Sequence, residues 1–300
     1  MEEIARDLAV VPMALVNAYL VGDSKLWVLV DSGTPGNTGK IREAAEARFG
    51  PGARPRAIVL THGHFDHAGN AKKLADQWDV SVYAHRLERP YLTGQSDYPP
   101  LDPTAPGFFS MLTRFFPNGT VTVDERFAEL PSDLSEVGLG DWELVNTPGH
   151  TAGHVSFFRR SDRTLLAGDA FATVNMDNAI ALITKRPQVY RPATPGTSDW
   201  QQARKSVESL AALRPSVLAT GHGVPMSEGL DQLTELARNF PIPEHGRYAK
   251  EPARADETGV TYLPPAPPDR LPKIAAGVAA SVVLAGVGAW LLKKAARDDD

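Results

Sequence analysis

The feature that most constrains the fold is a run of metal-binding residue types directly behind an apolar stretch. The run Thr-His-Gly-His-Phe-Asp-His at 61–67 follows Ala-Ile-Val-Leu and precedes a helical pattern. The apolar stretch predicts a short buried strand over 57–62 that leads into a loop. Side chains two residues apart in extended chain point the same way, so His62 and His64 can face one centre, while the Asp-His pair on the following turn can face another. We therefore expect these candidate metal ligands: His62, His64, Asp66 and His67.

Three more candidate ligands follow later strand patterns, each beside a glycine that gives the backbone room. They are His150 in Thr-Pro-Gly-His after the strand pattern 142–146, Asp169 in Gly-Asp after 164–167, and His222 in Gly-His-Gly after 216–220. A single Gly-Asp or Gly-His-Gly is more typical of a turn. Several strand ends that all carry ligand types indicate one shared edge of a sheet.

The chain up to about residue 240 mixes strand and helix patterns. Further strands are expected over 11–21, 26–33, 80–84 and 155–158, and helices over 40–49, 71–78, 198–213 and 227–240. This mixture predicts an α/β (α+β) domain over 1–240, with sheets flanked by helices. Residues 87–130 break the rhythm because they are rich in proline and aromatics. We expect a lid or pocket wall there, a satellite helix at 108–115, or both.

Composition excludes several kinds of site. The chain has no cysteine, which rules out disulfides, thiolate zinc sites, iron–sulfur clusters and cysteine nucleophiles. A net charge of -5 is unlike that of a general nucleic-acid binder, so no nucleic-acid partner is expected. The N-terminal ten residues carry acids where a signal peptide needs basic residues, and we expect no secretion signal.

The C-terminal part has a different composition. Residues 241–273 are rich in proline and predict an extended linker. Residues 274–292 carry no charge, and as a helix they would span roughly 28 Å, which predicts a transmembrane helix before the charged tail 293–300. The alternative is a buried alanine-rich helix of the domain. Small residues recur every fourth position in this segment, a pattern suited to a homodimer in lipid.

The whole series HxHxDH, TPGHTxGH, GD and GHG resembles the metallo-β-lactamase superfamily over about residues 10–240, and FDHAG is similar to its lactonase and glyoxalase II-like branch. The resemblance implies a four-layer αββα sandwich with a metal site at one edge of the two sheets. It implies that His62, His64 and His150 bind a first metal. It implies that Asp66, His67 and His222 bind a second, and that Asp169 bridges both. It further implies that Asp31 supports the site and that His154 lies beside it without binding metal.

These ligand types suit two divalent ions, with zinc expected and iron or manganese as alternatives. Two ions can share one water and lower its pKa, which gives a bridging hydroxide as nucleophile. Asp66 and Asp169 are the expected catalytic residues, and Asp66 can orient the hydroxide or carry a proton. We expect a hydrolase of a small ester, lactone or thioester.

Three alternatives to this hydrolase remain open. They are a phosphodiesterase or nuclease, an iron-dependent redox enzyme of the same fold, and a membrane-tethered scaffold that uses metal only to fold. The expected location is the cytoplasmic face of the membrane, or the soluble cytoplasm if the helix does not insert. The remaining histidines, His85 and His245, are expected to be structural or on the surface.

Overall fold

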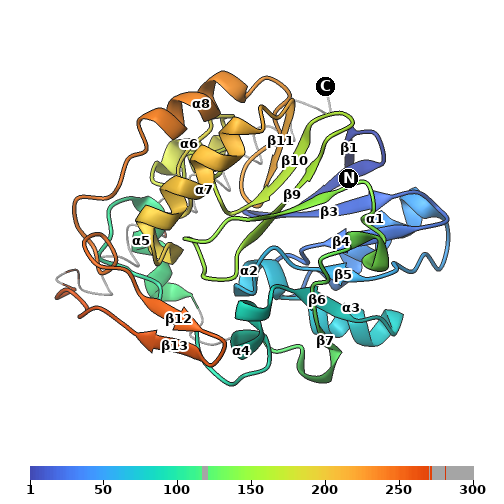
Figure 1. Cartoon of the computed structure of the whole chain (residues 1–300), viewed down its shortest axis with the longest axis horizontal. Coiled ribbons are helices and arrows are strands. Elements are labelled where there is room, and N and C mark those ends of the chain that lie inside the picture. Colours follow the sequence, from blue (N-terminus) through green and yellow to red (C-terminus); the bar gives the residue numbers. More distant parts are fainter. Residues whose placement is uncertain (117–120, 270, 272–280, 282–300) are drawn as a thin grey trace.

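The computed structural model describes residues 1–116, 121–269, 271 and 281. Two β-sheets lie face to face, and helices cover both outer faces, with α1 and α3 on one side and α7 and α8 on the other (Figure 1). The mixed α/β sandwich expected from the sequence is therefore present.

The first sheet has seven strands in the order of the chain. They are β1 (Glu2–Ala5), β2 (Leu8–Pro12), β3 (Asn17–Gly22), β4 (Trp27–Val30), β5 (Ile58–Val59), β6 (Val82–Ala84) and β7 (Phe127–Glu129). The first four strands pair antiparallel, and β4 to β7 pair parallel. Helices α1 (Thr38–Phe49) and α3 (Ala71–Trp78) lie in the crossovers between the parallel strands.

The second sheet has four strands in the order β11-β10-β9-β8. They are β8 (Glu143–Asn146), β9 (Val155–Arg159), β10 (Thr164–Gly168) and β11 (Val217–Thr220). Helices α7 (Trp200–Ala212) and α8 (Leu230–Arg238) cover its outer face. The Asp199 carboxylate accepts hydrogen bonds from the backbone N–H groups of Gln201 and Gln202, which caps the start of α7.

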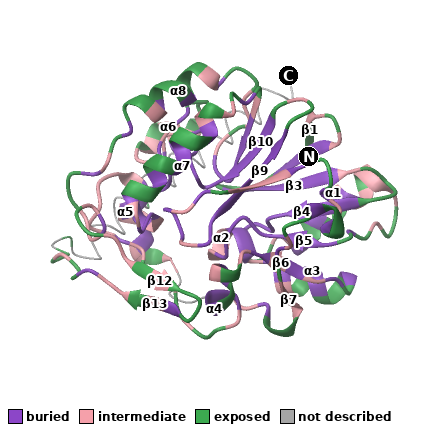
Figure 2. Ribbon diagram, viewed as in Figure 1, coloured by how far each residue is buried: buried purple, intermediate pink, exposed green. Residues whose placement is uncertain are grey.

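Side-chain alternation along the strands builds the layers. In β2, Leu8 and Val10 face the second sheet, while Ala9 and Val11 pack under α1 and α3. All four side chains are buried, because a strand covered on both faces has no solvent side. Figure 2 shows the strands β3 and β10 mostly in the colour of buried residues. The same alternation in β9 sends Phe157 into the space between the sheets.

Short helices and 3-10 turns lie in the remaining connections between the strands. They are α2 (Phe65–Ala68), α4 (Arg89–Leu92), α5 (Phe108–Leu112) and α6 (Ala179–Thr184), with 3-10 turns at Arg86–Glu88, Thr113–Phe115, Asp124–Arg126, Leu134–Val137 and Thr194–Gly196. The satellite helix expected at 108–115 is therefore present, as α5 and the 3-10 turn behind it. Phe109 packs with Val174 and Leu182 in a small apolar cluster of its own.

Two expectations differ from the structure. The strand expected over 11–21 is two strands, because the chain reverses between them and Met13 N donates to Val16 O over 2.9 Å. The expected extended linker folds back onto the domain and forms the hairpin β12 (Arg254–Asp256) and β13 (Gly259–Tyr262). Tyr248 is buried against the α7 and α8 layer, and its hydroxyl donates to Pro100 O over 2.7 Å. The proline-rich composition of 241–273 predicted an extended chain and gave no sign that Tyr248 packs against the domain.

The transmembrane helix expected at 274–292 lies outside the described residues, apart from Ser281. Within the described part of the chain, no helix is both long enough and apolar enough to cross a membrane.

Candidate metal centre

The seven predicted ligands meet at one edge of the sandwich, where strands of both sheets end. The loop after β5 carries His62 and His64, helix α2 behind it carries Asp66 and His67, and the loops after β8, β10 and β11 carry the others. The two sheets are joined at this edge by a backbone hydrogen bond from Val155 N to Thr61 O of 3.0 Å. Three overlapping groups of candidate ligands result: His62, His64 and His150; His62, His67 and Asp169; and Asp66, His67 and His222.

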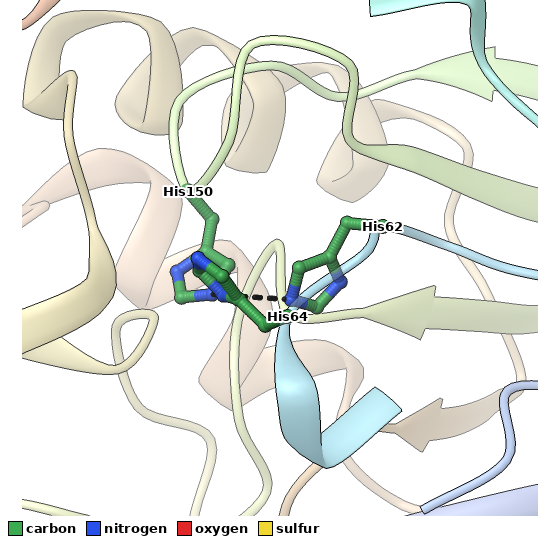
Figure 3. A group of neighbouring side chains, drawn as sticks. All are labelled: His62, His64 and His150. Atoms are coloured by element: carbon green, nitrogen blue, oxygen red, sulfur yellow. Dashed lines mark hydrogen bonds between the residues drawn. The ribbon is translucent and has the colours of Figure 1, made fainter. Parts of the chain in front are cut away.

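The first group consists of three imidazoles whose nitrogens converge (Figure 3). His64 Nδ1 lies 3.0 Å from His62 Nε2 and 3.0 Å from His150 Nε2. Burial lowers the pKa of all three rings, for His64 to about 4. The rings are therefore neutral at pH 7, which is the form in which histidine binds a metal.

Two threonines fix which nitrogen of the His62 and His150 rings carries the proton. Thr61 Oγ1 donates to Asp31, so it accepts from His62 Nδ1, which lies 3.1 Å away. Thr197 Oγ1 donates to Ala193 O, so it accepts from His150 Nδ1 over 3.1 Å. Each Nε2 then carries a lone pair that points at the other rings. A metal ion between the rings could accept these lone pairs.

The second group is oriented in the same way. His222 Nδ1 donates to Leu15 O over 2.6 Å, and its Nε2 lies 3.4 Å from Asp66 Oδ2. His67 Nδ1 donates to Asp31 Oδ2 over 2.8 Å, which leaves its Nε2 unprotonated in the neutral ring. Burial alone would lower the pKa of His67 and His222, but the nearby carboxylates outweigh burial and raise both values. The pKa of His67 is raised well above its ordinary value.

Asp169 lies between the two groups. Its carboxylate oxygens lie 3.5 Å from His150 Nε2, 3.0 Å from His222 Nε2 and 3.3 Å from His67 Nε2. Burial alone would raise the pKa of Asp169, but the charges of His222 and His67 hold it well below its ordinary value. The carboxylate is therefore anionic and faces both groups.

Two buried atoms test whether a metal fits. His67 Nε2 and Asp169 Oδ1 have no hydrogen-bond partner within the described residues. Buried polar atoms are almost always paired, so a ring nitrogen and a carboxylate oxygen that lie 3.3 Å apart without a hydrogen bond need an explanation. A cation that binds both atoms satisfies them, and the donor set of imidazole nitrogens and carboxylate oxygens is one that zinc and iron accept. The residues present fit a metal.

His154 supports the centre without joining any of the three groups. Its Nε2 accepts a hydrogen bond from Asp169 N over 2.8 Å, and its Nδ1 lies 2.8 Å from Thr147 Oγ1. Burial lowers the pKa of His154 to about 3, so the ring stays a neutral acceptor. This contact fixes the backbone of Asp169. The structure thus places His154 beside the site, as the resemblance implied.

A cavity of about 380 Å³ opens over both groups. The insert 87–130 supplies much of its wall, so this segment is both a pocket wall and the site of the satellite helix. The lining residues from this insert are Asp97, Tyr98, Pro99, Pro100, Leu101, Phe109 and Phe116. Among the described lining residues there is no lysine or arginine. The cavity therefore offers apolar walls around a charged floor.

The remaining histidines, His85 and His245, lie outside the candidate metal centre. His85 caps the 3-10 turn Arg86–Glu88, where its Nδ1 accepts from Leu87 N over 3.2 Å, and His245 is exposed. Sequence reasoning missed Glu88, Thr61 and Thr197, which contact the ligands or their loops. Glu88 gave no signal, because a glutamate in the charged stretch Arg-Leu-Glu-Arg at 86–89 is typical of a solvent-exposed segment.

Comparison with known proteins agrees with this geometry. A profile of the metallo-β-lactamase superfamily matches residues 12–222. The chain is 38% identical over 244 residues to "Probable metallo-hydrolase YflN" of Bacillus subtilis (strain 168), which covers 79% of this chain and 92% of that protein. It is 27% identical over 238 residues to "Probable metallo-hydrolase YybB" of the same organism, which covers 77% of this chain and 90% of that protein.

Solved structures with this fold include the BLEG-1 B3 metallo-β-lactamase, with a TM-score of 0.53 and 23% identity over 76% of this chain and 96% of that one. Another is TTHA1623 in a di-iron-bound form, with a TM-score of 0.51 and 25% identity over 75% of this chain and 96% of that one. The first likeness shows the fold alone.

Proposed function

Because this chain belongs to the metallo-β-lactamase superfamily, we propose that it hydrolyses a small ester, lactone or thioester with two divalent ions, expected to be zinc. The observation that carries the proposal is the pair of orphaned buried atoms, His67 Nε2 and Asp169 Oδ1, between two convergent groups of imidazoles and carboxylates. A scaffold that used metal only to fold would not need a cavity over the metal centre.

The proposed ligand sets follow the two groups. His62, His64 and His150 would hold one ion, while Asp66, His67 and His222 would hold the other, with Asp169 shared. Two ions held there would lower the pKa of a shared water and polarise the scissile carbonyl.

A carboxylate of the chain would transfer the proton of the attacking water. The Asp66 side chain is the more accessible of the two catalytic candidates, at 15% exposure against 3% for Asp169. Asp66 also lines the cavity. It can therefore accept a proton from the attacking water and return it to the leaving group. Asp169 is held from behind by His154 and keeps its place between the two groups.

The cavity wall supports a carboxylic substrate with an apolar part. Phe116 lies 5.6 Å from Phe65 and 5.5 Å from Phe109 between ring centres, and all three line the cavity. A cavity of about 380 Å³ suits a small molecule. A phosphodiester would be better served by a lysine or arginine, and the described lining residues contain neither.

The test is a substrate panel with the purified full chain. Its metal content would be measured first, and zinc, iron and manganese would be loaded separately. The panel would contain short and long acyl esters, lactones, thioesters, a β-lactam and a phosphodiester. We expect turnover of carboxylic substrates that is lost in Asp169→Ala. Turnover of the phosphodiester alone, or no hydrolysis with any metal bound, would overturn the proposal.

We also propose, from sequence alone, that residues 274–292 attach the chain to a lipid bilayer. Substitution Leu284→Arg would place a charge at the centre of the apolar segment, where it costs about 2.5–3.5 kcal/mol. We expect the full chain in the carbonate-washed membrane fraction and the variant in the supernatant. Asp300→Arg, in the tail, is the control. A full chain that remains in the supernatant would contradict the proposal.

A further inference from the structure

Glu88 is a fully buried carboxylate between the two loops that carry the first group of histidines. Its Oε2 accepts hydrogen bonds from Gly63 N, over 3.0 Å, and from the hydroxyl of Tyr98. Its Oε1 accepts from Thr151 Oγ1, over 2.7 Å, and from Gly153 N, over 2.9 Å. The side chain therefore has four donors around it.

Each oxygen of Glu88 accepts from a loop of a different sheet. Gly63 lies between His62 and His64 in the loop after β5 of the first sheet. Thr151 and Gly153 follow His150 in the loop between β8 and β9 of the second sheet. One carboxylate therefore ties together the two loops whose imidazole nitrogens must meet.

The surroundings are shaped to admit this carboxylate. A Cβ at Gly153 would lie 2.7 Å from Glu88 Oε1, so only glycine lets the backbone come this close. The Tyr98 ring stacks on Tyr91 at 3.9 Å and lies 4.6 Å from the His64 ring. The ring of Tyr98, whose hydroxyl donates to Glu88, therefore packs against the proposed ligand His64. Within the described residues no lysine or arginine forms an ion pair with Glu88, and its side-chain hydrogen bonds there go to the two loops and to Tyr98.

We infer that Glu88 is a positioning residue of the metal centre, which sets the spacing between the His62–His64 loop and the His150 loop. The inference rests on the proposed function in one respect, since it requires that the first group binds a metal. Residues that orient ligands in this way typically change metal affinity 10–100-fold when they are substituted.

The amide substitution Glu88→Gln tests this role with little change of volume. A glutamine has one acceptor oxygen and one NH₂ group. Whichever way it is turned, the NH₂ group faces one backbone N–H, either Gly63 N or Gly153 N, and that loop loses its acceptor. Thr151→Val is the milder second variant, because it removes a single donor from Oε1.

The experiment is chelator competition for zinc with the full-length protein, together with the absorption spectrum of the cobalt-loaded protein. We expect Glu88→Gln to lose about 10–100-fold in metal affinity, with an altered cobalt spectrum, and Thr151→Val to lose less. Asp177→Asn is the matched control. Asp177 also accepts from several donors, among them Arg191 and Thr194, but it contacts no proposed ligand.

The outcomes separate the two proposals. If the unmodified protein binds no metal, the proposed function fails. If the unmodified protein binds metal and folded Glu88→Gln binds it equally well with the same cobalt spectrum, the role of Glu88 fails alone. If Asp177→Asn weakens metal binding as much as Glu88→Gln does, the effect is one of general stability and the inference is overturned.

Discussion

The carboxylate of Asp31 and the imidazole of His67 form a buried hydrogen bond of 2.8 Å from Nδ1 to Oδ2. The same carboxylate accepts from Thr61 N over 2.8 Å and from Thr61 Oγ1 over 2.9 Å. Asp31 therefore orients His67 directly and His62 through Thr61. Its own backbone has φ 57°, a left-handed conformation that costs free energy in a non-glycine residue and is typical of functional sites.

Substitution Asp31→Asn is expected to weaken metal binding. The new amide NH₂ would take the place of one of the two carboxylate oxygens. In one orientation it would face His67 Nδ1 and Thr61 Oγ1, and in the other it would face Thr61 N. In the first case His67 must move its proton to Nε2, where it blocks the inward lone pair. We expect about a 10–100-fold loss of metal affinity, measured by chelator competition. Asp162→Asn, whose carboxylate pairs with Arg159 outside the site, should leave the affinity unchanged. Equal affinity in Asp31→Asn and the unmodified protein would refute the role of Asp31.

The close approach of Gly221, which directly follows β11, to Asp169 gives a second prediction. A Cβ at Gly221 would lie 2.1 Å from Asp169 Oδ1 and 2.5 Å from His67 Cε1. Gly221→Ala must therefore displace at least one proposed ligand, and we expect the bound metal to fall from two ions to one or none. Elemental analysis of the purified variant measures this. Gly39→Ala in α1 meets open space and should keep both ions, with a gain in stability of about 0.5–1 kcal/mol. Two ions in folded Gly221→Ala would contradict the prediction.

The convergence of the seven candidate ligands was predictable because its signal is local. Each of the seven follows an apolar strand pattern within a few residues, and glycine marks the turn beside it. Strand ends that carry such residues indicate a shared edge, and the structure brings all seven together there. The alternation of side chains along β2 and β9 likewise fixes which residues face which layer, so the sandwich could be predicted from the apolar patterns.

The supporting residues were not predictable because their contacts are distant in the sequence. Glu88 and Thr151 are 63 residues apart, and His150 and Thr197 are 47 apart. Nothing near either residue in the sequence distinguishes it from a surface glutamate or a loop threonine. The hairpin β12–β13 was missed for a related reason, since Val260 N of β13 donates to Ser96 Oγ over 3.2 Å, and the two residues are 164 apart in the chain.

Metal removal should lower thermal stability only where the centre is intact. A ligand at 100 times its dissociation constant stabilises the folded state by about 2.7 kcal/mol, roughly 5–10 °C in midpoint for a domain of this size. We expect a chelator to lower the unfolding midpoint of the metal-loaded protein by about that much, and to leave Asp169→Ala unchanged. Calorimetry with and without chelator measures both shifts. A chelator that leaves the midpoint of the unmodified protein in place would argue against a resident metal.

The aromatic wall gives a prediction about substrate selection, with a matched control in the adjacent residue. Phe116 lines the cavity, whereas Phe115 is 50% exposed and is absent from the cavity wall. Phe116→Ala removes apolar contact that is the same in the ground state and the transition state, so it should raise KM with little change in kcat. For an ester with a long acyl chain we expect KM to rise about 10-fold, which corresponds to about 1.4 kcal/mol of lost contact, and for an acetyl ester to change little. Phe115→Ala should leave both esters unaffected. An equal effect of Phe116→Ala on long and short esters would show that the acyl chain does not bind against this wall.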